Sequence, residues 1–284
     1  MSGKPVFNYI ITIHNKEFLL ERVLAGVAEC AGSDALILPV LDGCTDGSEE
    51  VAVKFARESP VETRVLYAPD VNEIITINIA LREARPGYCV IIQDDVILQE
   101  PRLEEKIDNL CVSRKNRLGY ISFRLAADMS PTPLYRRLRL VRRLGLKALR
   151  PLVEEREHVG HPGETLGVPK IDYGEFVERM VGIKSPVCIT PELRRVEPFL
   201  DEALAPYCYD DHDLSLRSLR QGLVNGLFGI RFETNEEWSG AKKDPTYATY
   251  GDYVRWRNRS LMWVKHGDFI LHYLATRPGR RAST

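Results

Sequence analysis

An aspartate at the end of an apolar run constrains the fold of this chain most strongly. Residues 35–41 are apolar, and Asp42 follows them directly. A turn with two glycines, Gly43 and Gly47, comes next, and Thr45 or Asp46 stands where a helix cap is expected. A carboxylate at the C-terminal tip of a buried strand is typical of nucleotide pockets in open α/β sheets.

A second acidic strand end comes about fifty residues later. The apolar run 89–92 leads through Gln93 into Asp94 and Asp95. Because the carboxyl ends of parallel strands meet at one edge of a sheet, we expect Asp42, Asp94 and Asp95 to share one rim.

The first 125 residues alternate between strand-like and helix-like segments. Periodicity predicts strands at 6–13, 35–41, 63–67, 88–93 and 118–123, and helices at 16–30, 48–57, 75–84 and 101–110. Such alternation predicts an α/β fold with a Rossmann-like, mostly parallel central sheet flanked by helices.

The pattern changes at about residue 126. Residues 134–152 carry seven basic and no acidic side chains, with leucines at helical spacing. This segment is either an interfacial helix that attracts anionic lipid or a domain helix whose arginines meet the acidic residues 154–157. We expect a loop at 154–170, apolar packing at 181–189, helices at 211–220 and 253–274, and a disordered basic tail at 276–284.

Composition excludes several classes of protein. The chain has 284 residues, enough for one large or two small domains, and its net charge of −1 gives no overall attraction to nucleic acid. Six scattered cysteines without a Cys-x-x-Cys pair indicate neither a zinc site nor a disulfide framework, and favour a reducing cytoplasm. There is no charged-then-apolar leader and no apolar run near the ~20 residues of a membrane span. We expect a cytoplasmic protein that is soluble or peripheral at the inner face of the membrane.

Four motifs in the same order resemble the family 2 glycosyltransferases of GT-A fold, over about residues 6–266. The first two are the acidic strand ends at Asp42 and at Asp94-Asp95. The third resembles the family's Glu-Asp-x-Asp-Leu-x-x-Arg acceptor motif, and the fourth its Arg-Asn-Arg and Lys-His tail. In this sequence the last two read Asp210-Asp211-His212-Asp213-Leu214-Ser215-Leu216-Arg217, then Arg257-Asn258-Arg259 with Lys265-His266.

The resemblance implies a role for each matching residue on the donor side. It assigns nucleotide-sugar binding to Ile13, Asn15, Asp42, Asn78 and Asp94, and a divalent metal, Mn²⁺ or Mg²⁺, to Asp95. Such a cation neutralises the charge that builds on a leaving diphosphate. The alternatives are that Asp42 holds its own turn and that Asp94 and Asp95 are solvated carboxylates at a helix start.

On the acceptor side the resemblance implies that Asp211 is the general base of an inverting transfer. Asp210 and Asp213 crowd it with negative charge, which raises a carboxylate's proton affinity. The alternative is an acid-rich helix N-terminus that the helix dipole favours. Asp213 and Arg217, four residues apart, are expected to form a structural ion pair.

The sequence also departs from the family pattern. Leu41 and Gln93 stand where relatives carry aspartate, and Ile77 stands where arginine is frequent. Residues 232–239, where many relatives place a histidine metal ligand before a serine, contain no histidine. Glu233 or Glu236 is a candidate to replace that histidine as a metal ligand.

Together, these motifs and their order predict one GT-A domain at 1–275. A nucleotide-sugar half at 1–125 precedes an acceptor half at 126–275. The expected activity is sugar transfer from a nucleotide-diphosphate donor to a hydroxyl acceptor on a cell-surface glycan or lipid-linked saccharide. The alternatives are a GT-A-like binding protein without catalysis and a sugar nucleotidyltransferase. That last class normally opens with a Gly-rich loop after the first strand, and residues 12–17 contain no glycine.

Overall fold

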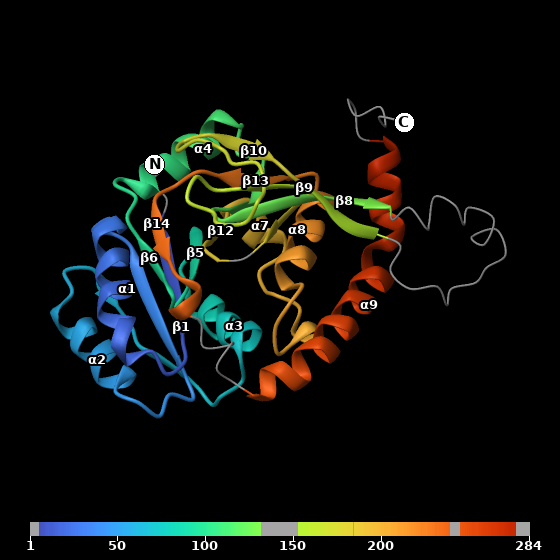
Figure 1. Cartoon of the computed structure of the whole chain (residues 1–284). Helices are drawn as coiled ribbons and strands as arrows, with labels where there is room; N and C mark the ends of the chain where they lie inside the picture. Colours follow the sequence, from blue (N-terminus) through green and yellow to red (C-terminus); the bar gives the residue numbers. More distant parts are fainter. Residues whose placement is uncertain (1–5, 132–152, 184, 239–244, 277–284) are drawn as a thin grey trace.

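A computed structural model describes residues 6–131, 153–183, 185–238 and 245–276 (Figure 1). The predicted basic helix at 134–152 and the tail beyond 276 lie outside these residues. Among those described, no helix combines the length and the apolar character that crossing a membrane requires.

The first half alternates strands and helices as predicted. Its elements are β1 (Phe7–Ile13), α1 (Glu17–Cys30), β2 (Leu36–Asp42), α2 (Ser48–Glu58), β3 (Glu62–Thr63), β4 (Leu66–Ala68), α3 (Glu73–Glu83), β5 (Tyr88–Gln93), β6 (Val96–Leu98), α4 (Leu103–Ser113) and β7 (Leu118–Ser122). Every residue of β2 is buried, as a continuous apolar strand in the middle of a parallel sheet should be.

The second half adds further strands and helices. Its elements are β8 (Leu125–Pro131), β9 (Val153–Gly160), β10 (Phe176–Glu178), β11 (Val181–Ile183), β12 (Val187–Ile189), α7 (Pro191–Val196), η1 (Glu202–Leu204), α8 (Asp210–Arg220), β13 (Val224–Phe228), β14 (Phe232–Thr234), η2 (Glu236–Trp238) and α9 (Pro245–Thr276). The expected helices at 211–220 and 253–274 are confirmed, and α9 begins earlier, with a proline in its first turn.

The central sheet has the order β10-β13-β7-β12-β5-β1-β2-β3, with β4 also paired to β2. Strands β5, β1 and β2 run parallel to one another. The sheet is mixed because β12 runs antiparallel to both β5 and β7, and β10 runs antiparallel to β13. The sheet therefore keeps the parallel arrangement where the two acidic strand ends were predicted.

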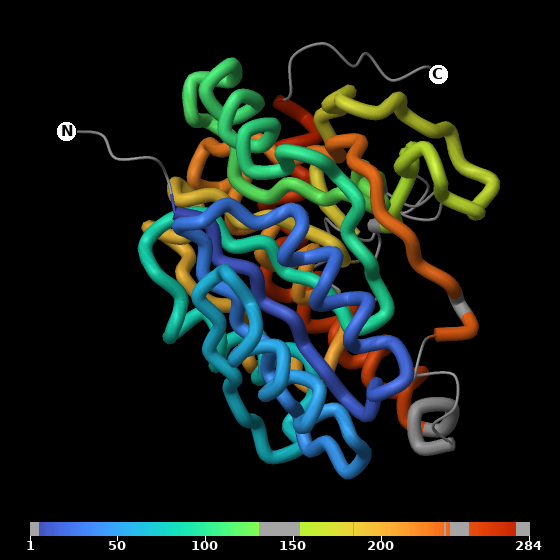
Figure 2. Tube along the Cα trace, turned by 90° about the vertical axis from the view of Figure 1, so that its left-hand side faces the viewer, coloured from blue at the N-terminus to red at the C-terminus, as the bar shows by residue number. Residues whose placement is uncertain are grey.

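Two hydrophobic clusters cover the two faces of this sheet. Helices α1 and α4 pack on one face, where Leu20 and Ile107 are fully buried. Helices α3, α8 and α9 pack on the other, with Ile74 and Leu216 fully buried. Figure 2 is viewed from the side of α1 and α2, and α9 lies behind the sheet in that view.

The prediction of a loop at 154–170 is wrong for its first seven residues. Strand β9 runs antiparallel to β8, and β8 also pairs with β11. Residues 154–158 are all charged or histidine, so the apolar alternation that signals a strand is missing. The backbone pairing with β8 forms this strand, although its side-chain pattern does not predict one.

Candidate active site

The two acidic strand ends share one rim, as predicted. Strand β1 lies between β2 and β5, so Ile13, Asp42 and Asp94 come at neighbouring strand ends. His14 follows β1 and contacts both acidic strand ends. Its backbone N–H donates to Asp94 Oδ2 at 2.8 Å, and its Nδ1 lies 2.7 Å from the carbonyl oxygen of Asp42.

Asp42 anchors the loop that leads into α3. Its Oδ1 and Oδ2 accept the backbone N–H groups of Val71 and Asn72, each at 2.8 Å. The side chain is buried, so these bonds replace the water that the charge loses. Asp42 therefore holds a neighbouring loop rather than its own turn.

Asn15 organises the turn after β2. Its Oδ1 accepts the backbone N–H groups of Thr45 at 2.7 Å and Asp46 at 3.3 Å. Gly43 is needed there because its φ is +58° and a Cβ would lie 2.5 Å from Cβ of Asp70. Both residues shape the rim beside Ile13.

Lys16 is a buried cation beside the acid pair. Its ammonium lies 3.2 Å from Asp94 Oδ1 and donates to the carbonyl of Trp238 at 2.7 Å. Burial raises the pKa of Asp94 to about 6, and the Lys16 charge opposes that rise. Sequence reasoning missed Lys16, although a basic residue directly after the first strand was a visible signal.

Asp95 carries a buried oxygen that fits a cation. Among the described residues, Oδ1 of Asp95 has no hydrogen-bond partner. Burial raises the pKa of this carboxyl, against the opposing charges of Lys16 and Arg124. A hard carboxylate oxygen of this kind suits Mg²⁺ or Mn²⁺, which are often held by one or two carboxylates together with substrate phosphates.

No group of three or more His, Cys, Asp or Glu side chains arranged to bind a metal occurs within the described part of the chain. Glu233, a candidate late ligand, lies on β14 and pairs instead with Arg22 at 3.2 Å, with 45% of its side chain exposed. Strand β14 nevertheless lies beside β6, where Thr234 pairs with Val96, directly after Asp95.

Glu73 links the donor-side acids to the acceptor motif. It begins α3, and Gln93 donates to its Oε1 at 2.5 Å. Burial, together with the smaller effects of the negative charges on Asp211, Asp95 and Asp94, raises the pKa of Glu73 to about 7, against the opposing hydrogen bond from Gln93. Sequence reasoning missed Glu73 because the helix was expected to begin at residue 75.

Asp211 lies in the first turn of α8, on the same side as Glu73. Burial and the charges of Asp211 and Glu73 raise the pKa of its neighbour Asp210 well above the usual range. Asp211 Oδ1 lies 2.6 Å from Nδ1 of His212. Beyond His212 is a cavity of about 140 Å³ whose lining includes Glu155, Tyr209, His212, Arg259, Met262 and Trp263.

Asn78 has a structural role. It is fully buried, its amide donates to the carbonyl of Leu200 and to Glu202, and its Oδ1 accepts the backbone N–H of Leu200. These bonds fix the segment before the acceptor motif. We therefore leave Asn78 out of the donor site that the resemblance implied.

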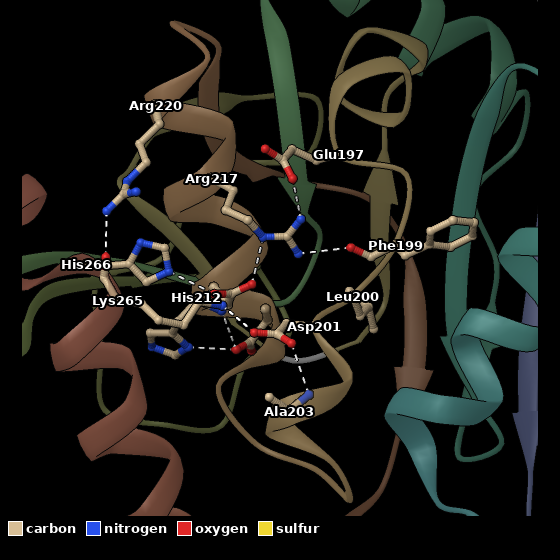
Figure 3. Close-up of polar contacts among 12 residues, drawn as sticks. Glu197, Phe199, Leu200, Asp201, Ala203, His212, Arg217, Arg220, Lys265 and His266 are labelled. Atoms are coloured by element: carbon tan, nitrogen blue, oxygen red, sulfur yellow. Dashed lines mark hydrogen bonds and ion pairs between the residues drawn. The ribbon is translucent and has the colours of Figure 1, made fainter.

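The ion pair predicted between Asp213 and Arg217 is confirmed at 2.7 Å. Asp213 is fully buried and also contacts Lys265 and, at 2.8 Å, His266 of α9. Figure 3 shows Arg217, Lys265 and His266 converging from two helices. The third and fourth sequence motifs thus meet at one buried carboxylate.

The family model for glycosyl transferase family 2 matches residues 9–162, more than half of the chain. The chain belongs to this family. No curated protein matches it. The matched region holds both acidic strand ends, while Asp211 lies outside it.

Solved structures of glycosyltransferases share the fold. S. aureus TarS 1–349 in complex with UDP aligns with a TM-score of 0.52 at 13% identity, over 79% of this chain and 58% of that one. TarS 1–349 in complex with UDP-GlcNAc gives 0.51 at 12%, over 82% and 60%. The mannosyltransferase PcManGT from Pyrobaculum calidifontis, in complex with GDP-Man and Mn²⁺, gives 0.51 at 15%, over 80% and 55%. This chain therefore spans less than two thirds of each, and the likeness establishes the GT-A fold.

Proposed function

We propose that this chain is an inverting glycosyltransferase that moves a sugar from a nucleotide-diphosphate donor to a hydroxyl acceptor. One observation carries the proposal. Glu73 lies within electrostatic reach of Asp94 and Asp95 on the donor side and of Asp211 on the acceptor side. Acids from three distant segments thus act on one side chain, which supports a single site where a diphosphate and an attacking hydroxyl would meet.

The rim would hold the nucleotide and the sugar. Each carboxylate oxygen of Asp42 has a lone pair beyond its backbone bond, so it can accept from a base N–H. Ile13 and the turn fixed by Asn15 would form the wall beside it, and Asp94 would meet the sugar or ribose. Solved structures of similar fold in complex with UDP, UDP-GlcNAc and GDP-Man support a nucleotide-sugar donor, and UDP-GlcNAc and GDP-Man are the donors to test first.

Asp95 would hold a divalent cation, Mn²⁺ or Mg²⁺, on its buried oxygen, with Asp94 beside it. When bound, this ion would neutralise charge on the leaving diphosphate. Lys16 adds a fixed positive charge on the same side. The remaining ligands would come from the diphosphate and water.

Asp211 would act as the general base. The acceptor oxygen attacks the anomeric carbon from the face opposite the diphosphate, the bond from that carbon to the diphosphate oxygen breaks, and the hydroxyl proton moves to Asp211. One displacement of this kind inverts the anomeric centre. By family resemblance we place the acceptor among surface glycans or lipid-linked saccharides.

The test is turnover of UDP-GlcNAc and GDP-Man by wild type and by Asp211→Asn, with and without Mn²⁺. We expect the variant to bind the donor as wild type does while turnover falls at least 100-fold, the scale of a lost general base. Undiminished turnover would refute the role of Asp211. Binding without turnover by wild type would instead support a GT-A-like binding protein.

A further inference from the structure

His212 is enclosed between two carboxylates. It lies in the first turn of α8 with 5% of its side chain exposed. Its Nδ1 is 2.6 Å from Asp211 Oδ1, and its Nε2 is 3.0 Å from Glu155 Oε1 on β9. The backbone N–H of His212 donates to the same Asp211 oxygen at 2.7 Å.

This geometry requires the charged imidazolium. Carboxylates only accept hydrogen bonds, so both ring nitrogens must donate, and only the imidazolium carries two N–H groups. Burial alone lowers the pKa of His212, but Asp211 and Glu155 outweigh it and raise that pKa to about 10. In turn the pKa of Glu155 is lowered to about 2, because its bonds to His212 and His158 outweigh its burial.

A β-bulge brings Glu155 into place. Ala126 pairs with Val159 and Asp128 with Arg156, so β9 carries one residue more than β8 between these pairs. Glu157 takes the extra position with φ of 51°. The bulge lets Glu155 and His158 face the same side, where His158 Nε2 lies 2.9 Å from Glu155 Oε2. Both oxygens of Glu155 are thereby bound to imidazoles.

We propose that His212 is a positioning residue for the Asp211 carboxylate. Glu155 of β9 holds the His212 ring, and His158 of the same strand holds Glu155. The inference rests on the proposed role of Asp211 as base. The His212 cation fixes Oδ1 of Asp211 and keeps that carboxylate ionised, which a general base requires before it takes a proton. The charged or titratable groups around His212 are Asp210 and Asp211 of α8, Tyr209 before it, Glu154, Glu155 and His158 of β9, Arg259 of α9 and Glu73 of α3.

The direct test is a ¹⁵N NMR titration of the histidine-labelled full chain, with the His212 signals assigned by their loss in His212→Gln. We expect both ring nitrogens of His212 to report imidazolium at pH 8. Glu155→Gln keeps the side-chain size and removes one charge, so the titration midpoint should fall by at least one unit. The matched control is Glu157→Gln, an exposed acid two residues further along β9, and it should leave the midpoint within about 0.3 units. A neutral His212 at pH 7 in wild type overturns the proposal.

The second readout is the pH profile of donor turnover with UDP-GlcNAc or GDP-Man. His212→Gln should lower kcat about tenfold at pH 7 and move the acid limb of the pH profile to higher pH by about one unit. The reason is that the variant removes a positive charge beside Asp211, which favours the protonated form of that carboxyl. The donor KM should stay within twofold. If Asp211→Asn loses turnover while His212→Gln keeps the wild-type profile, His212 has no positioning role and the proposed function stands. If wild type turns over neither donor, the proposed function is refuted and the NMR titration still decides whether the charged contact exists.

Discussion

At the scale of single residues, Asp95 gives the sharpest test of metal binding. Its buried Oδ1 has no hydrogen-bond partner among the described residues. Burial of this negative charge therefore lowers the stability of the fold unless a cation binds. We expect Asp95→Asn to keep or raise the melting temperature without metal, and to lose most of the Mn²⁺-dependent stabilisation by UDP-GlcNAc or GDP-Man. Thermal shift with and without Mn²⁺ measures both effects. The exposed Asp34→Asn is the control, and an Asp95→Asn protein that keeps the full Mn²⁺ response would contradict the assignment.

The pH dependence of stability should report the His212–Glu155 contact. The folded-state pKa of His212, about 10, lies above its unfolded value of 6.5. Its contribution to the free energy of unfolding is therefore fully present below pH 6.5 and is lost as the pH rises through 10. Glu155, with its pKa lowered from 4.5 to about 2, contributes above pH 4.5 and loses that contribution as the pH falls through 2. Urea unfolding from pH 6 to 10 should show His212→Gln less stable by about 3 kcal/mol at pH 6, with the gap narrowing toward pH 10. A gap that stays constant over that range would contradict the linkage.

At the scale of elements, Asp213 ties α8 to α9. Its carboxylate has no solvent exposure and meets Arg217, Lys265 and His266 (Figure 3). These bonds hold the pKa of Asp213 well below its usual range. Asp213→Asn removes the buried partner of the partly exposed cations Arg217 and Lys265 and should cost about 3 kcal/mol in urea unfolding at pH 7. Asp252→Asn removes an exposed α9 ion pair with Arg255 and should cost under about 1 kcal/mol. Equal losses in the two variants would show that burial of Asp213 contributes nothing.

The elements that sequence predicted best are those with strong periodicity. The apolar runs of β1, β2 and β5 gave the strand ends, and the rule for parallel sheets placed Asp42 and Asp94 on one rim. The charge-rich β9 has no such pattern, so Glu155 could not be placed. Glu73 was missed for a different reason. Its role depends on the turn before α3, which Asp42 fixes through Val71 and Asn72.

At the scale of the whole molecule, the approach of Asp211 to the donor-side acids comes from tertiary packing. Asp211 follows Asp94 by more than a hundred residues, and no local pattern connects them. Family resemblance alone supplied that expectation. Helices α3 and α8 pack on the same face of the sheet, and Glu73 of α3 lies within electrostatic reach of Asp94, Asp95 and Asp211.

The long helix α9 tests whether residues 1–275 form one domain. Val254, Met262 and Ile270 of α9 are buried, the last two in the cluster that holds α3 and α8. Asn258, also buried, donates to the carbonyls of Leu204, Tyr207 and Cys208 just before the acceptor motif. Losing three buried apolar side chains at about 2 kcal/mol each removes roughly 6 kcal/mol, comparable with the whole stability of an ordinary domain.

A chain ending at residue 244 should therefore lose its cooperative thermal transition, measured by circular dichroism. A chain ending at residue 276 keeps every α9 contact named here and should melt within about 2 °C of the full chain. If the shorter chain melts cooperatively at the full-chain temperature, α9 is an appendage and the single-domain proposal is wrong. If the shorter chain fails to fold, the structure around the acceptor motif, which contains Asp211, depends on α9, a helix that comes later in the sequence.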